Sequence, residues 1–113
     1  MTAYAVAHLR SVDQNAEIVD YLRRIDATLD PFDGRFAVHG VVPEVLEGEW
    51  PGVIVVIGFP DLDAARAWYD SPAYQEILPL RTRNSDGVTL IVDGVPDGYR
   101  AVDYLAKLAG SPS

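Results

Sequence analysis

The chain has 113 residues, 49% of them hydrophobic, and 9 basic against 17 acidic residues give it a formal net charge of −8. This size and apolar content predict one ordinary globular domain with one core and exclude a disordered chain. The negative charge repels phosphate backbones and anionic lipids, so nucleic acid and membrane are not expected partners, and the absence of cysteine excludes disulfides and thiolate chemistry.

The longest apolar stretch covers residues 53–59, which is much too short to cross a bilayer. The N-terminus lacks the basic flank and long apolar core of a signal peptide. We therefore expect a cytoplasmic protein.

The first half of the chain predicts a strand, a helix and a second strand. Residues 4–10 form the first strand, followed by a turn and helix cap at residues 11–13. The helix is indicated by one apolar stripe at offsets of three and four, comprising Ile18, Tyr21, Leu22, Ile25 and Leu29. Pro31 and Gly34 end this helix, and residues 35–40 form the second strand.

The second half repeats the pattern. Residues 53–59 form a strand, and a helix capped by Asp61 presents Leu62, Ala65, Trp68 and Tyr69 inward. Ser71 and Pro72 begin a shorter helix that Pro79 bends or ends, with Tyr74, Ile77, Leu78 and Arg81 on one face. Residues 88–92 form the last strand, and residues 101–109 have helical periodicity.

This order of elements predicts an α+β fold of βαββαβ type. Right-handed crossovers then give a four-stranded antiparallel sheet with both main helices on one face, which is the ferredoxin-like arrangement. We expect residues 1–98 to form this domain and residues 99–113 to form a C-terminal helix and a solvated tail.

The strand over residues 53–59 is apolar on both faces, whereas two helices cover only one face of a sheet. An exposed apolar face of this size usually marks an interface, so we expect a homodimer. The alternative is that the terminal helix folds across the second face within one chain.

Several motifs closely resemble the family called domain of unknown function 1330. They are Glu47-Gly48-Glu49-Trp50, Phe59-Pro60, the run from Ala64 to Tyr74 and Leu78-Pro79-Leu80-Arg81. The resemblance covers residues 3–95 and implies a dimeric α+β barrel, in which two ferredoxin-like sheets pack face to face. The chain departs from the family pattern at Asp33, where glycine is common, and in the helix after residue 95.

The resemblance implies no reaction, although the wider superfamily includes cofactor-independent monooxygenases, lactone isomerases and polyketide cyclases. A shared fold does not by itself show that two proteins catalyse the same reaction. The chain has no glycine-rich phosphate loop, so we expect no nucleotide or flavin cofactor. Its two histidines lie on separate strands, and we expect no metal site.

The segment 41–52 is long for a hairpin connection and contains Val45, Leu46 and Trp50, which a solvated loop would not favour. It is either a lid over a cleft or a clasp on a partner subunit. Glu47 and Glu49, two residues apart, point to the same side and suit acid or base chemistry, although surface carboxylates are the default. Glu47 is the better candidate and could pair with Arg35 or Arg81.

The remaining candidates lie on the predicted helices and strands. Arg81 follows an apolar face and could bind a carboxylate or enolate, or form an internal ion pair. Alternation places His39 with Arg35 on the more polar side of its strand, where it could act as a base. The candidate ligand contacts are Arg35, Trp50, Trp68, Tyr69, Tyr74 and Ser71. The aromatic residues also have an ordinary interpretation as core residues, and Ser71 as a helix cap.

Two hypotheses follow. In the first, the protein is a cofactor-independent enzyme acting on a hydrophobic oxygenated compound such as a polyketide or lactone, with His39 or Glu47 as proton acceptor, Arg81 as anion stabiliser and Tyr74 as hydrogen-bond donor. In the second, the chain is a non-catalytic binding or structural homodimer, and the same polar residues form a stabilising network.

Overall fold

The computed structural model describes residues 2–110. In chain order the elements are β1 (Ala3–Val12), α1 (Ala16–Leu29), a 3-10 turn (Asp30–Phe32), β2 (Arg35–Val41), β3 (Val53–Phe59), α2 (Leu62–Asp70), α3 (Pro72–Thr82), β4 (Ser85–Asp93) and α4 (Asp103–Gly110). The strands form one antiparallel sheet in the order β2-β3-β1-β4. The predicted ferredoxin-like α+β fold is confirmed, with an additional C-terminal helix. The predicted tail over Ser111 to Ser113 lies outside the described residues.

Helix starts follow local capping chemistry at two of the three predicted sites. The side chain of Asp61 accepts a hydrogen bond from the backbone N–H of Ala64, and Ser71 accepts one from Tyr74, as expected. The cap predicted at residues 11–13 is wrong, because β1 continues to Val12 and Asn15 caps α1. The pairing of Val12 with Ser85 in the sheet extends the strand through the predicted turn.

Pro79 does not end α3, which continues to Thr82. The backbone N–H of Arg83 donates to the carbonyl of Pro79, so the last turn forms on the far side of the proline. Tyr74 and Ile77 are almost completely buried against the rest of the core. Tertiary packing on the preceding turns therefore offsets the hydrogen bond that a proline cannot donate.

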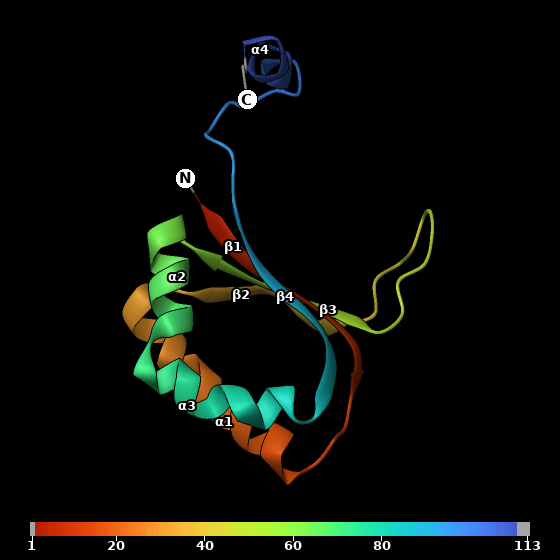
Figure 1. Ribbon diagram of the computed structural model, residues 1–113, viewed down its shortest axis with the longest axis vertical. Helices are drawn as coiled ribbons and strands as arrows, with labels where there is room; N and C mark the ends of the chain where they lie inside the picture. The colour runs from red at the N-terminus through yellow and green to blue at the C-terminus, as the bar shows by residue number, and fades with distance from the viewer. Residues whose placement is uncertain (1, 111–113) are drawn as a thin grey trace.

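Helices α1, α2 and α3 form one layer against one face of the sheet (Figure 1). The core between the layers is apolar and contains Ala3, Ala5, Tyr21, Ile25, Leu29, Ile57, Phe59, Ala65, Trp68, Tyr74 and Ile77. Gly34 lies where a Cβ would approach both Leu29 and Phe59 to 2.7 Å, which explains glycine at the start of β2.

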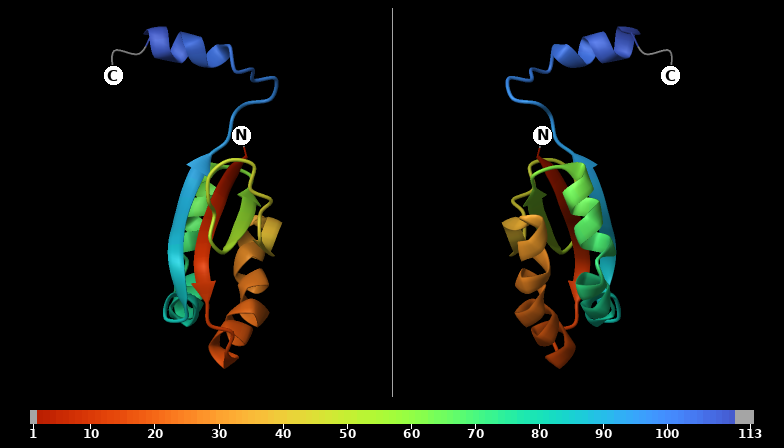
Figure 2. Two further views of the ribbon diagram at one scale, coloured as in Figure 1. Left: turned by 90° about the vertical axis from the view of Figure 1, so that its right-hand side faces the viewer. Right: turned by 90° about the vertical axis from the view of Figure 1, so that its left-hand side faces the viewer.

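The opposite face of the sheet, here called the open face, has no layer over it within residues 2–110 (Figures 1 and 2). The strand register places a set of mostly apolar side chains there, namely Tyr4, Val6, His8, Val38, Val41, Ile54, Val56, Val88, Leu90 and Val92. Three of them on β4, Val88, Leu90 and Val92, are 44–49% exposed. Both faces of the sheet are therefore apolar, as predicted from β3.

The predicted position of His39 is wrong. Two register shifts interrupt β2, between Phe36 and Val38 and between His39 and Val41. Phe36 pairs with Ile57 and His39 pairs with Val55, so both point toward the helices, whereas Arg35 pairs with Gly58 and points to the open face. The first shift adds one residue to the count and so sends His39 to the helix side, and the second shift returns Val41 to the open face.

Two segments extend away from the core (Figure 1). The β2–β3 loop, residues 42–52, stands out from the open face, and α4 lies beyond the end of the sheet. No residue of α4 is buried. The terminal helix therefore does not fold across the open face of its own chain.

Candidate functional site

A cavity of about 510 Å³ lies between the sheet and the helix layer. Its walls come from β1, β2, β3 and β4 on one side and from α1, α2 and α3 on the other, and they are mostly apolar. The apolar lining residues are Ala5, Ala7, Leu9, Val12, Ile18, Leu22, Ile25, Phe36, Val53, Val55, Ile57 and Trp68. A space of this size and character suits a small organic molecule.

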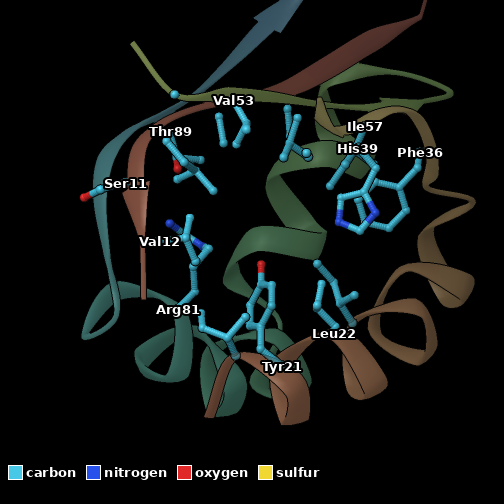
Figure 3. A pocket seen from close by; sticks show the side chains of 18 of the residues that line it. Ser11, Val12, Tyr21, Leu22, Phe36, His39, Val53, Ile57, Arg81 and Thr89 are labelled. Atoms are coloured by element: carbon cyan, nitrogen blue, oxygen red, sulfur yellow. The ribbon is translucent and has the colours of Figure 1, made fainter. Parts of the chain in front are cut away.

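A cluster of three polar side chains, Tyr21, Tyr74 and Arg81, forms part of the wall on the helix side. The hydroxyls of Tyr21 and Tyr74 share a hydrogen bond of 2.8 Å, and both rings are buried. Tyr21 comes from α1, whereas Tyr74 and Arg81 lie on one face of α3. The antiparallel contact of α1 with α3 therefore assembles this cluster from two helices (Figure 3).

The charges of this cluster are fixed by its surroundings. Burial raises the pKa of Tyr21, and the neighbouring Tyr74 raises it further, against a smaller lowering by Arg81. Tyr21 is therefore a neutral phenol that donates or accepts hydrogen bonds and does not act as a base. Burial lowers the pKa of Arg81, but Tyr74 and Tyr21 raise it by more, so the guanidinium stays charged.

His39 lines the same cavity from the sheet side. Its imidazole stacks on Phe36, with ring centroids 4.4 Å apart and an angle of 26° between the planes. Figure 3 shows this stack on β2, across the cavity from Arg81 and Tyr21. The bulge in β2 thus brings an imidazole, a guanidinium and two phenols to one apolar cavity.

Trp68 also lines the cavity, but its polar atom is engaged elsewhere. The indole N–H donates to the Thr28 hydroxyl at 3.0 Å, and that hydroxyl donates to the carbonyl of Ile25. The ring packs at 4.1 Å from the ring of Tyr74. Trp68 therefore contributes an aromatic surface, and the partly buried Tyr69 supports it in an edge-on contact without lining the cavity.

Ser71 is a structural cap. Its hydroxyl accepts from the backbone N–H of Tyr74 and donates to the carbonyl of Trp68. Both bonds are local to the junction between α2 and α3, and Ser71 is not among the cavity residues.

The candidates on the β2–β3 loop and the open face lie away from the cavity lining. Glu47 and Glu49 are exposed, and Arg35 is exposed on the open face. Within residues 2–110 the ion pairs are Arg10–Asp86, Arg24–Asp20, Arg24–Glu76 and Arg83–Glu17, so neither predicted pairing of Glu47 is among them.

Trp50 packs on the open face and anchors the β2–β3 loop. Its ring stacks on His8 with centroids 3.9 Å apart, and His8 donates from Nε2 to the carbonyl of Pro51 at 2.6 Å. The Trp50 indole nitrogen is buried and has no hydrogen-bond partner among residues 2–110.

Sequence reasoning missed Tyr21 and Thr89 as cavity residues. Tyr21 was assigned to the apolar stripe of α1, yet a tyrosine in an otherwise aliphatic stripe is a signal, because a buried phenol needs a hydrogen-bond partner. Thr89 carries a polar side chain among the valines, leucine and isoleucine of β4, on the helix side of the sheet.

Among residues 2–110, no group of three or more histidine, aspartate or glutamate side chains is placed to hold a metal ion. Within that range no helix has the length and apolar character needed to cross a membrane.

A four-stranded antiparallel sheet, helices on one face and a cavity between the layers define a ferredoxin-like α+β protein with an internal pocket. The chain belongs to the family described as domain of unknown function (DUF1330), whose sequence profile matches residues 2–95. This match confirms the resemblance drawn from the motifs. No curated protein matches the chain significantly.

Solved structures share the fold at low sequence identity. A protein of unknown function from Rhodopseudomonas palustris is 15% identical, with a TM-score of 0.64 over 87% of this chain and 84% of that one. SnoaB from Streptomyces nogalater, described as a cofactor-independent oxygenase, is 13% identical, with a TM-score of 0.57 over 88% and 98%. A dimeric ferredoxin-like protein from Jannaschia is 13% identical, with a TM-score of 0.55 over 83% and 100%.

Proposed function

We propose that this protein is a homodimer in which each subunit binds a small hydrophobic, oxygen-bearing compound, such as a polyketide or lactone, in its internal cavity. The observation that carries the proposal is the mostly apolar cavity of about 510 Å³, into which the Tyr21, Tyr74 and Arg81 cluster and His39 bring polar groups from opposite walls. Its other polar lining residues are Arg10, Ser11, Gln14 and Thr89. Apolar walls with a few convergent polar groups are the usual composition of a ligand site.

The open face supports the homodimer. It is a broad apolar surface without a cover in the single chain, and soluble proteins rarely leave such a surface exposed. Two sheets that pack face to face would bury it on both subunits. The Jannaschia protein of the same fold is described as dimeric, which is consistent with this arrangement.

The polar cluster supports a ligand that carries an oxygen atom. Arg81 supplies a fixed positive charge, and the two phenols supply hydrogen bonds in an apolar surrounding, where such interactions are strong. A ligand oxygen that carries negative charge, as in an enolate or phenolate, matches these donors. The remaining walls accept a flat apolar body, with Trp68 and Phe36 as aromatic surfaces.

As an enzyme, the protein would use His39 to remove a proton from a carbon beside a carbonyl group. The electron pair of the broken C–H bond would form the carbon–carbon double bond of an enolate, while the π pair of the carbonyl group would move onto its oxygen, where Arg81 and Tyr74 would stabilise the negative charge. The proton would go to the His39 imidazole. No cofactor takes part in this step. The protein shares its fold with SnoaB, which is described as a cofactor-independent oxygenase. That similarity is consistent with such chemistry, but a shared fold does not by itself assign a reaction.

The second candidate is a non-catalytic binding protein that uses the same cavity. It is favoured by the position of Glu47, the other proposed proton acceptor, which is exposed on the β2–β3 loop and not among the cavity residues of its own chain. In that case His39 would only complete the aromatic wall with Phe36.

Binding of 1-naphthol and naphthalene, measured by titration calorimetry, tests the cavity. We expect the naphthol to bind at least about tenfold more tightly, because only its oxygen meets Arg81 and the phenols. Arg81→Met should abolish that preference, whereas Arg66→Met, at an exposed arginine of α2, should keep it. Equal affinities in the wild type would overturn the proposed oxyanion site.

Turnover separates the two candidates. Proton exchange at the carbon beside the carbonyl of 2-tetralone, followed in D₂O by NMR, reports the first catalytic step. An enzyme should accelerate the exchange, and His39→Gln should remove the acceleration while the naphthol still binds. Binding without acceleration for this and related ketones would favour the non-catalytic protein.

A further inference from the structure

Helix α4 is an amphipathic helix whose residues all lie exposed within the described range 2–110. Leu105 and Leu108 lie three residues apart and share one side of the helix, and Val102, at the same spacing, directly precedes its first residue. The side chains of Val102, Leu105 and Leu108 are 64%, 60% and 62% exposed. An isolated helix of eight residues is only marginally stable in water unless its apolar face packs against other apolar residues. We therefore expect another protein surface to pack against α4.

The segment before α4 directs the helix away from its own domain. The backbone N–H of Gly94 donates to the carbonyl of Thr2, which holds the chain at the end of the sheet. Turn bonds from Tyr99 to Pro96 and from Asp103 to Arg100 then shape the connection. Figure 2 shows the helix beyond the end of β4 and clear of the helix layer.

The β2–β3 loop also has exposed apolar side chains. Val42 and Leu46 are 74% and 88% exposed, and Val45 is 44% exposed. The loop stands out on the side of the open face, where the proposed partner sheet would lie (Figure 1). These apolar side chains are therefore exposed on a loop that lies where a second subunit would pack.

The two segments leave the sheet at opposite ends. At one end Ala3 pairs with Asp93, the last residue before the connection to α4. At the other end Leu9 pairs with Val53, the first residue after the loop. From this attachment the loop turns back, so that its tip lies toward the end of the sheet from which α4 extends (Figures 1 and 2). A twofold axis that lies between two facing sheets and runs along their strands keeps like ends together, so each α4 would lie beside the tip of the partner's loop, and the contact would occur twice.

We propose that in the homodimer α4 of each chain packs its apolar face against the β2–β3 loop of the other chain. This inference rests on the proposed homodimer and adds an exchanged contact outside residues 2–95, the part that matches the family. The exposed open-face residues of β4 run directly into Val95, also exposed at 58%, so the apolar surface is continuous from the sheet to the connection.

The last turn of α4 is complementary in charge to the loop. The loop carries three exposed carboxylates, Glu44, Glu47 and Glu49, and no basic residue. Helix α4 carries Asp103 in its first turn and Lys107, the only lysine in the sequence, in its last turn. Opposite charges at the rim of an apolar contact favour the correct partner more than they add affinity.

The sequence has no cysteine, so engineered thiols test the contact without background. Leu46→Cys and Leu108→Cys are made in separate chains with tags of different mass, mixed and mildly oxidised. We expect a disulfide-linked dimer that contains one chain of each kind. Val19→Cys, at a side chain of α1 that is 44% exposed, serves as control and should not link to Leu108→Cys.

A second variant measures the contribution to assembly in the full chain. Leu105→Asp should raise the dimer dissociation constant roughly tenfold or more, because it removes a buried leucine from each of two contacts. A dimeric wild type in which the cysteines do not link and Leu105→Asp changes nothing would overturn this inference alone. A monomeric wild type would overturn the homodimer as well.

Discussion

At the scale of single residues, the cavity depends on side chains whose roles are not visible along the chain. Tyr21 and Tyr74 are 53 positions apart and join through one hydrogen bond next to Arg81. His39 reaches the same space only because β2 contains bulges. Glu47, which the sequence favoured through its motif, lies in an exposed loop.

The phenol pair gives a prediction for stability. Tyr21→Phe and Tyr74→Phe should each cost about 1 to 2 kcal/mol, because each leaves the remaining buried hydroxyl without its partner. The double variant should cost less than the sum of the two, since the bond is lost only once. Urea unfolding of the four proteins measures this, and strictly additive effects would contradict the shared bond.

Glu17 gives a prediction for pH dependence. Hydrogen bonds from Arg83 and then Asn84 hold the pKa of its carboxyl below the ordinary 4.5. A carboxyl with a lower pKa in the folded state stabilises the fold above that ordinary value and loses this contribution as the pH falls through the folded-state pKa. The contribution of Glu17 to stability should therefore be lost in the wild type as the pH falls below the ordinary pKa of 4.5.

Glu17→Gln is the matched control for this decline. It should lower the melting temperature modestly at pH 7, because the group is exposed, and it should flatten the acid decline. Thermal unfolding from pH 7 to pH 3 checks both effects. An equally steep acid decline in the variant would assign the pH dependence to other carboxylates, such as Asp86 beside Arg10.

At the scale of elements, the β2–β3 loop is attached to the sheet by a close contact. Gly52 has a φ of +95°, and a Cβ there would lie 2.0 Å from the carbonyl oxygen of Leu9. Gly48, in the middle of the loop, has a φ of +83° but no atom within 4 Å of an added Cβ. Both glycines therefore have the positive φ that favours glycine, but only at Gly52 would an added Cβ also collide with a neighbouring strand.

Alanine at each position separates these effects. Gly48→Ala should cost about 1 kcal/mol through the left-handed backbone alone. Gly52→Ala should cost at least about 2 kcal/mol more, because the strand end must also move away from β1. Chemical denaturation of both variants measures the difference, and equal losses would show that the contact with Leu9 relaxes freely.

At the scale of the whole molecule, the sheet has two apolar faces and one layer of helices, and this imbalance underlies the proposed homodimer. Leu90 on the open face and Val19 on α1 are both 44% exposed in the single chain. An aspartate at either position should therefore be tolerated similarly by the isolated subunit. Only Leu90 faces the proposed partner sheet.

Leu90→Asp should convert the dimer to a folded monomer, because an unpaired charge buried between sheets is costly. Val19→Asp should leave the dimer intact. Sedimentation velocity at micromolar concentration, with circular dichroism to verify folding, distinguishes the two. A dimeric and folded Leu90→Asp would place the interface elsewhere.

The order of strands and helices, the caps at Asp61 and Ser71, the exposed second apolar face of the sheet and the family were all readable from the sequence, because periodicity, capping and motifs depend on residues close together in the chain. The extension of α3 past Pro79, the side of the sheet that His39 faces and the meeting of Tyr21 with Tyr74 and Arg81 were decided by the tertiary structure. These features depend on strand register and on packing between distant helices. A single extra residue at the first bulge of β2 moves His39 to the other face of the sheet. No pattern of neighbouring residues in the sequence indicates that this bulge occurs.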